Sequence, residues 1–297
     1  MSRETSAGTG KPYGLERVCR VLEFPRSTIY AQRQAARVVP LHPARRGPKP
    51  KVSDADLLAA IRADLAASPF TGEGHRKVWA RLRILCDIRV GRSRVLRLMR
   101  EHQLLSPHRR PQGAPVRHDG TITTERPNAM WGTDGIRIET VDEGWVWVFS
   151  AVDHFDACCV GIHAVKIGNR FAALQPIAQG LQSEFGATGA DAGRGLALRM
   201  DNGTQYTADD FLNQVKFWGI APSFAFVAEP QTNGVAERFN RTLKEQAIHG
   251  RVFKNVEELR AAVTAFKERY NRHWRLEKLG FMSPLEARQA YAMRKAA

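Results

Sequence analysis

Cysteine is scarce in this sequence, and long apolar runs are missing. Four cysteines occur in 297 residues, at positions 19, 86, 158 and 159, and no two of them form a Cys-x-x-Cys pair. This spacing argues against a zinc ribbon or a disulfide scaffold and favours reduced, partly buried thiols. No stretch of 18 uncharged apolar residues is present, so we expect no transmembrane helix. No apolar segment follows Met1, which argues against a signal peptide and favours a cytoplasmic protein.

Acidic residues are also in short supply, and the imbalance is uneven along the chain. There are 45 Lys and Arg against 30 Asp and Glu, a net charge of +15. Residues 1–120 carry +14, residues 121–237 carry −7 and residues 238–297 carry +8. The basic front favours a polyanionic partner, most simply nucleic acid, although a GC-rich genome would also enrich arginine. The acidic centre can approach phosphates through divalent cations held by its carboxylates.

The first 50 residues predict a helix-turn-helix followed by a basic linker. An apolar stripe at helical spacing is formed by Leu15, Val18, Cys19 and Leu22. Pro25 then breaks this helix and lies near the start of a second one. The candidate DNA-binding residues at the start of the second helix are Arg26, Ser27, Thr28 and Tyr30. Many helical hairpins share this pattern, so a purely structural hairpin is the alternative. Residues 37–52 hold four prolines among basic residues, which indicates an extended linker.

Residues 51–120 predict a second helical DNA-binding segment. Its last helix follows Gly91 and is crowded with arginines, of which Arg92, Arg94 and Arg97 are candidate DNA contacts. No acidic residue intervenes before Glu101, which favours phosphate binding over a merely solvated charged face. Residues 106–128 are rich in Pro, Arg, His and Gly and indicate a second linker.

Beyond the second linker the pattern changes from helices to strands. Three consecutive strand-like runs predict an antiparallel meander. Pro176 lies inside the helical pattern that follows, which implies a kink or a later helix start. Thr207 is expected to cap another helix. The expected strands are 131–141, 145–152, 157–164, 196–200 and 220–227, and the expected helices are 171–185, 207–218, and those starting at 234, 255 and the capping box 283–286.

Three acids stand out by their context. Asp134 lies within the first expected strand, where a charge is expensive unless it is used. Asp201 directly follows a short strand, and Gly203 permits a tight turn there. Glu237 lies near the start of a helix, with 35 residues between it and Asp201. Two strand acids and one helix acid converge if the helix packs on the sheet, and three carboxylates can hold two Mg²⁺ ions for phosphodiester chemistry.

Two basic residues share a helix face with Glu237. Arg241 and Lys244 follow it at i+4 and i+7, so all three would face the same phosphate. The alternative is an ordinary Glu–Arg salt bridge on a solvated helix. The two upstream aspartates favour the functional interpretation.

The chain resembles the DDE transposases of bacterial insertion sequences, of the type encoded by a second reading frame, which have a retroviral-integrase-like core. The resemblance covers nearly the whole chain, and the Asp–35–Glu spacing followed by Lys244 is specific. The matching segments are Asn128-Ala-Met-Trp131-Gly-Thr-Asp134, Val152-Asp-His-Phe155, Arg199-Met-Asp201-Asn-Gly203-Thr-Gln-Tyr206, Pro230-Gln-Thr-Asn233-Gly-Val-Ala-Glu237-Arg-Phe-Asn-Arg-Thr-Leu-Lys244, and Tyr270-Asn-Arg with Leu279-Gly-Phe-Met-Ser283-Pro. One departure is Ile136 after Asp134-Gly135, where many relatives carry Thr.

The resemblance implies an α/β fold: a ribonuclease-H-like mixed five-stranded sheet flanked by helices and preceded by all-α helix-turn-helix segments. It implies Asp134, Asp201 and Glu237 as catalytic residues and ligands of two Mg²⁺ ions, with Mn²⁺ able to substitute. The expected domains are 1–50 and 51–120 for DNA binding, 121–250 for the catalytic core and 251–297 for a C-terminal helical extension.

The expected function is that of a transposase that cleaves and joins DNA strands. Its partners would be double-stranded DNA, as terminal inverted repeats and target DNA, a second copy of the chain on DNA and an upstream reading-frame product, with no membrane. The alternatives are a DNA-binding regulator with an inactive core and a nuclease without strand transfer.

Other polar and aromatic residues are expected to be structural. Asp153 ends a strand at a turn and is left out of the catalytic set. His154 and His163 are isolated, and lone histidines are more often structural than ligands. Trp131 and Trp145 are expected in the core, with DNA contact as the alternative for Trp131.

Overall fold

The computed structural model describes residues 4–37, 51–106, 123–225 and 233–296. Most of the two expected linkers, 37–52 and 106–128, and the segment from Pro230 to Thr232 lie outside these residues. The chain forms two units, residues 1–51 and 52–297. No helix in the described ranges is long and apolar enough to cross a membrane.

The first unit contains the two expected short helices, α1 (Leu15–Val21) and α2 (Arg26–Arg37). Glu16 of α1 lies between two arginines, Arg20 at 3.6 Å and Arg26 at 3.5 Å. Cys19 of the apolar stripe is buried, whereas Leu22 of the same stripe is 58% exposed and the neighbouring Val21 is 74% exposed. The pair of helices therefore buries little apolar surface by itself.

The second unit begins with a three-helix bundle of α3 (Asp54–Ala67), α4 (His75–Leu85) and α5 (Arg92–Glu101). Ser53 caps α3, because its hydroxyl accepts a hydrogen bond from the Asp56 amide at 3.1 Å. The buried core of the bundle is formed by Leu57, Ile61, Val78, Leu82, Val95, Leu98 and Met99.

A mixed five-stranded sheet lies at the centre of the remaining chain, as predicted. Its strands are β1 (Met130–Thr140), β2 (Gly144–Asp153), β3 (Cys159–Val165), β4 (Ala197–Met200) and β5 (Ala221–Phe224). The spatial order is β3-β2-β1-β4-β5. The first three strands form an antiparallel meander, and β4 and β5 run parallel to β1. This is the expected ribonuclease-H-like arrangement.

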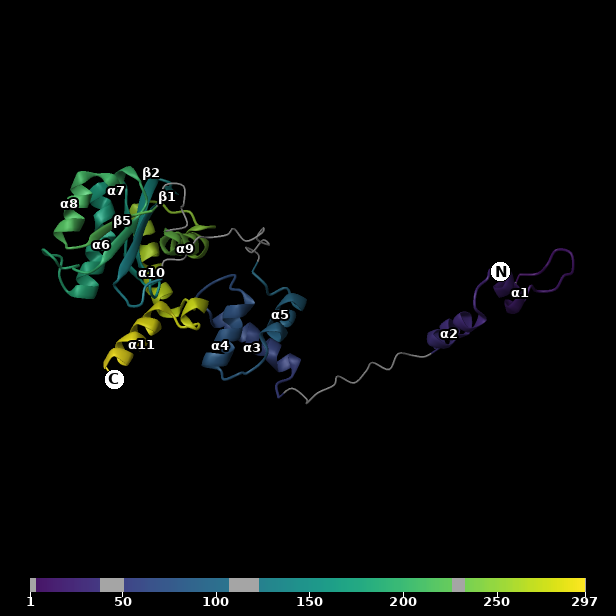
Figure 1. Cartoon of the computed structure of the whole chain (residues 1–297). Coiled ribbons are helices and arrows are strands. Elements are labelled where there is room, and N and C mark those ends of the chain that lie inside the picture. Colours follow the sequence, from purple (N-terminus) through teal and green to yellow (C-terminus); the bar gives the residue numbers. More distant parts are fainter. Residues whose placement is uncertain (1–3, 38–50, 107–122, 226–232, 297) are drawn as a thin grey trace. The chain divides into compact units, whose positions relative to one another are not determined.

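Helices cover both faces of the sheet (Figure 1). One face carries α6 (Arg170–Phe185), α7 (Thr204–Thr207) and α8 (Asp209–Phe217), which pack around buried Trp131, Phe149 and Leu198. The other carries α9 (Gly234–Leu243), the π-helical turn η2 (Lys244–Ile248) and α10 (Val256–His273). The 3₁₀ turn η3 (Glu277–Leu279) and α11 (Pro284–Ala296) complete the chain.

Two local expectations are confirmed and two are corrected. Asn255 caps α10, and Ser283 and Glu286 form the predicted reciprocal capping box of α11. Thr207 ends α7 instead of capping a helix, and Ala208 precedes α8. Pro176 does not delay α6, which already begins at Arg170.

The two tryptophans expected in the core have different environments. Trp131 is fully buried, whereas Trp145 is 54% exposed, so its placement in the core was wrong. The Arg137 guanidinium lies 5.5 Å from the Trp145 ring centroid. The alternation of β2 puts Trp145 on the face that α6 covers, but near the hairpin end of the strand, where that cover stops.

A buried ion cluster holds α11 to the meander. Arg288 contacts Asp153 at 2.9 Å and Asp156 at 2.8 Å, and it also pairs with Glu184 of α6. Both aspartate side chains are fully buried. Burial and repulsion from Asp156 raise the pKa of Asp153 to about 6, while Arg288 acts in the opposite direction. Asp153 therefore has a structural role here, because it also accepts the amides of Asn128 and Phe155.

We predict that Arg288→Met lowers the free energy of unfolding by about 3–5 kcal/mol, because two buried carboxylates lose their cation. Chemical denaturation measures the change. The matched control is Arg272→Met, which removes an exposed pair with Glu268 and should cost less than about 1 kcal/mol. Equal losses for the two variants would contradict this role of Arg288.

Candidate active site

The strand register places Asp134 and Asp201 beside each other. β1 and β4 pair in parallel from Met130 opposite Ala197 to Gly132 opposite Arg199. Asp134 lies two residues beyond Gly132 in β1, and Asp201 lies two residues beyond Arg199, directly after the end of β4. Side chains alternate along strands, so both aspartates point to the face on which α9 packs. The electrostatics agree, because the charge of Asp201 contributes to raising the pKa of Asp134.

Asp134 is held by hydrogen bonds within the sheet and α9. The Gly135 amide donates to Oδ1 at 2.8 Å, and Nδ2 of Asn240 donates to Oδ2 at 2.9 Å. Asn240 is itself oriented by the buried Ser150 hydroxyl, which donates to its Oδ1 at 3.1 Å. Burial raises the pKa of Asp134, and these two hydrogen bonds and the charge of Lys244 lower it in part.

Glu237 and Asp201 are more exposed than Asp134. Partial burial and the nearby charge of Asp134 raise the pKa of Glu237, and Arg241 opposes this shift. The Gly203 amide donates to Oδ1 of Asp201 at 3.0 Å, in the tight turn that the sequence predicts. The acids therefore come from β1, from the turn after β4 and from α9, and Asp134 and Glu237 each have a neighbouring negative charge.

The start of α9 is fixed directly to β1. Asn233 donates from Nδ2 to the Thr133 carbonyl at 3.0 Å. Gly132 allows this close approach, since an added Cβ would lie 2.9 Å from Oδ1 of Asn233 and 3.0 Å from Nε2 of His154. His154 is buried there, and burial lowers its pKa to about 4, so it is neutral near pH 7.

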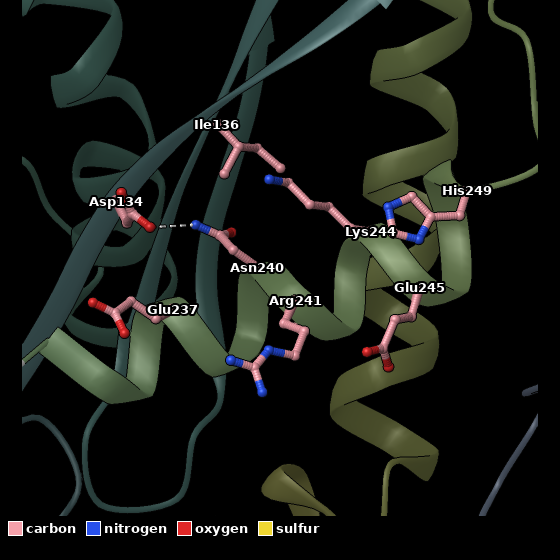
Figure 2. Close-up of a pocket in the computed structure, with 8 residues that line it drawn as sticks. All are labelled: Asp134, Ile136, Glu237, Asn240, Arg241, Lys244, Glu245 and His249. Carbon is pink, nitrogen blue, oxygen red and sulfur yellow. Dashed lines mark hydrogen bonds between the residues drawn. The ribbon is translucent and has the colours of Figure 1, made fainter. Parts of the chain in front are cut away.

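A pocket of about 350 Å³ opens between β1 and the helix that follows Asn233. Figure 2 shows Asp134 and Glu237 at one end and the basic side chains further along the helix. The lining residues are Asp134, Ile136, Glu237, Asn240, Arg241, Lys244, Glu245 and His249. Asp201 does not line this pocket, and in the described part of the chain no three His, Cys, Asp or Glu residues form a group that could hold a metal ion.

The donor set nevertheless fits a hard divalent cation. Asp134 and Glu237 are oxygen ligands that line one pocket, and repulsion from Asp134 adds to the burial that raises the pKa of Glu237. A cation between them would relieve that repulsion, and Mg²⁺ and Mn²⁺ prefer carboxylate oxygens.

Two basic residues of the pocket have no acid within ion-pair distance in the described part of the chain. Among the described residues, neither Arg241 nor Lys244 forms an ion pair or a side-chain hydrogen bond. The alternative of a Glu237–Arg241 salt bridge is therefore not realised. Both cations remain available to an anionic ligand.

The arginines of α5 have partners that the sequence did not reveal. Arg94 and Arg97 both bind Asp54 at the start of α3, each at 2.6 Å, and Arg97 also contacts Glu101. Hydrogen bonds from Arg97 and Arg94 hold the pKa of Asp54 below its ordinary value. The premise that these arginines have no acidic neighbour is wrong. Arg92 is half exposed and lies 3.8 Å from Glu277.

The candidate residues of α2 lie in the other unit of the chain. Tyr30 is 51% exposed, and a hydrogen bond between Tyr30 and Arg26 contributes to raising the pKa of Arg26. Ser27 and Thr28 lie in the first turn of the same helix. These four residues stay predicted DNA contacts.

Sequence reasoning missed Asn240 and His249. Asn240 follows Glu237 at i+3, so helical spacing could have identified it. His249 could not be found in this way, because the π-helical turn changes the spacing before it.

Known families match the chain in three segments. An HTH-like domain model matches residues 53–112, and two integrase core domain models match residues 124–230 and 218–284. The expected second helix-turn-helix falls within the first match, and the sheet with α9 and α10 falls within the other two. The chain therefore carries an integrase core domain preceded by a helix-turn-helix-like domain.

The relatives are transposases of insertion sequences. The transposase of element IS629 from Shigella sonnei is 27% identical over 94% of this chain and 93% of that protein. Transposase InsD of the IS2 elements of Escherichia coli is 28% identical over 78% of each chain. Among solved structures, the catalytic core domain of BIV integrase is 22% identical over 57% of this chain and 99% of that one, with a TM-score of 0.40. The resemblance to insertion-sequence transposases that the motifs predicted is confirmed.

We predict that Asn240→Leu lowers the affinity of the pocket for Mn²⁺ about 10–100-fold, because Asp134 loses the group that orients it and stabilises its charge. Calorimetric titration measures the affinity. The free energy of unfolding of Asn240→Leu should be about 1–3 kcal/mol lower than that of the wild type, since the buried Ser150 hydroxyl loses its acceptor.

The matched control for this prediction is Ser150→Ala. It removes the hydroxyl but leaves the bond from Asn240 to Asp134, so Mn²⁺ affinity should be largely kept. A wild-type affinity in Asn240→Leu would show that Asn240 does not position the carboxylate.

Proposed function

We propose that the chain is a transposase that cleaves DNA at the ends of an insertion sequence and joins those ends to target DNA. The observation that carries the proposal is the pocket: two repelling carboxylates at one end and unpaired basic side chains beside them. An anionic substrate can meet the carboxylates only with cations between them. DNA in the presence of Mg²⁺ or Mn²⁺ satisfies both ends of the pocket.

Asp134, Asp201 and Glu237 are the residues that would hold two divalent cations. When bound, such ions activate the attacking oxygen and stabilise the leaving oxygen of a phosphodiester. Asp201 lies beside the pocket, in a turn directly after β4, and is the third ligand in this proposal. Asn240 and the Gly135 amide would orient Asp134 for that task.

Arg241 and Lys244 would bind the phosphates next to the reacting one. Both are on the pocket side of the helix that carries Glu237, and neither is neutralised by an acid in the described part of the chain. Their contacts are with charge rather than with bases, so they would position the strand without selecting a sequence.

Sequence choice would come from the helical segments in front of the core. The helices starting at Arg26 and at Arg92 are the candidates, with base contacts in the major groove and arginine contacts to phosphates. A reaction on two element ends favours a second copy of the chain on DNA. An upstream reading-frame product is proposed as a further partner.

Two other functions make different predictions. A DNA-binding regulator with an inactive core would need no carboxylates in the pocket. A nuclease would cut strands but not join them. The pairing of the repelling acids with free cations favours chemistry in the core, and product analysis separates joining from cutting.

We predict that Asp134→Asn, Asp201→Asn and Glu237→Gln each abolish Mg²⁺-dependent nicking and joining of DNA that carries candidate element ends. DNA binding should persist, because the substitutions remove metal ligands and leave the helical segments unchanged. Gel analysis of labelled strands measures both products. The same products from wild type and variants would refute the catalytic role, and nicks without joining would favour the nuclease.

We predict that Arg92→Ala weakens DNA binding equally for all sequences and reduces the slope of log affinity against log salt by about one, because one phosphate contact is lost. The melting temperature of Arg92→Ala should match that of the wild type, since the ion pair between Arg92 and Glu277 is long and exposed. Arg94→Ala is the contrasting variant, and it should lower the melting temperature, because Asp54 loses one of its two arginine partners and the Val52 carbonyl loses its donor. If the salt dependence of Arg92→Ala equals that of the wild type, Arg92 does not contact a DNA phosphate.

A further inference from the structure

The helix that carries Glu237 contains one extra residue after Leu243. Lys244 to Ile248 form a π-helical turn, and the amide of His249 donates to the Lys244 carbonyl at 2.8 Å, five residues back. An α-helix closes this bond after four residues. Such single π turns are rare, and many of them lie at functional sites.

The extra residue changes which side chain reaches the pocket. In an uninterrupted α-helix, Glu237, Arg241, Lys244 and the residue at i+11, Ile248, would share one face. Here Ile248 is 9% exposed and packs in the core with Leu243 and Phe253. His249 lines the pocket in its place, next to Lys244 (Figure 2). The turn thus keeps an apolar residue in the core and adds a third basic side chain to the pocket.

The imidazole of His249 is not used by the protein itself. Within the described ranges its ring takes part in no hydrogen bond or ion pair, although Glu245 lines the same pocket. His249 is exposed, so a ligand can reach it. At least one ring nitrogen of a histidine carries a donor hydrogen in either charge state.

The π turn is held from the outside by the helical bundle. The Thr71 amide donates to Oε1 of Gln246 at 3.0 Å, and Nε2 of Gln246 donates to the Thr71 carbonyl at 2.9 Å. Gln246 lies in the middle of the turn, between Lys244 and His249. This two-bond contact fixes the backbone that aims both side chains.

We propose that His249 binds a DNA backbone phosphate on the flank of the reacting phosphate, a role that rests on the function proposed above. A place among the metal ligands is disfavoured, because Arg241 and Lys244 lie between His249 and Glu237. His249 follows Glu237 by 12 residues, roughly 15–18 Å along a helix that rises about 1.5 Å per residue. Phosphates of one strand follow at about 3.4 Å of duplex axis, so the contacted phosphate lies several nucleotides from the reacting one.

The test is a phosphate scan of binding by the full chain. Duplexes with a candidate element end carry one neutral methylphosphonate at a time, and fluorescence anisotropy measures affinity without metal. For the wild type, we expect a loss of about 3–10-fold at individual flanking positions, the range of the net contribution of one ordinary hydrogen bond. His249→Ala should lose a similar factor on unmodified DNA and become insensitive at one of those positions. His249→Gln, which keeps a donor, should restore part of the affinity.

The matched control is His273→Ala, an exposed histidine of α10 that does not line the pocket. A His249→Ala profile identical to the wild type overturns the proposal, as does a flat wild-type profile or an equal change in His273→Ala. The readout is binding without turnover, so the result does not depend on whether the wild type catalyses strand cleavage. If the wild type cleaves no strand but His249→Ala still becomes insensitive at one methylphosphonate position, the proposed reaction is contradicted and the phosphate contact is not.

Discussion

The structure depends on a carboxylate that is placed inside the central strand of the sheet. Asp134 is paired through β1 with β2 on one side and lies just beyond the pairing with β4 on the other, so its backbone is held in the sheet. A buried charge is costly unless neighbouring groups stabilise it. Three neighbouring groups stabilise the charge of Asp134: the Asn240 amide, the Gly135 amide and, at longer range, Lys244. The nearby charge of Asp201 makes this cost larger, and a bound divalent cation would offset it.

The C-terminal half of the chain is organised around the helix that supplies those groups. Asn233 ties its start to β1, the π turn at its end is tied to Thr71, and α10 buries its apolar face in the same core as Phe239 and Leu243. The predicted boundary at residue 250 therefore runs through one continuous core. The Arg288 cluster then secures α11 to the meander.

Much of the fold and the acidic residues of the site were predictable, because their signals are local. Runs of high β propensity predicted β1 and β2, a glycine turn predicted the position of Asp201, and the capping box predicted α11. The partners of Arg94 and Arg97 were not predictable, because Asp54 lies some forty residues away and only folding brings it close. His249 was hidden for another reason: helical periodicity points to Ile248, and only the π turn reveals the shift. Trp145 shows that an apolar strand pattern does not tell where helices stop covering the sheet.

The most direct measurement is the position of bound metal. Crystals of the full chain soaked in Mn²⁺ give anomalous difference peaks that locate the ion without reference to activity. We predict peaks within coordination distance of the carboxylates of Asp134, Asp201 and Glu237, with Asp201 drawn toward the pocket. No peak at these acids under saturating Mn²⁺, or Mn²⁺ bound only elsewhere, would contradict the claim that the acids form a metal-dependent catalytic centre.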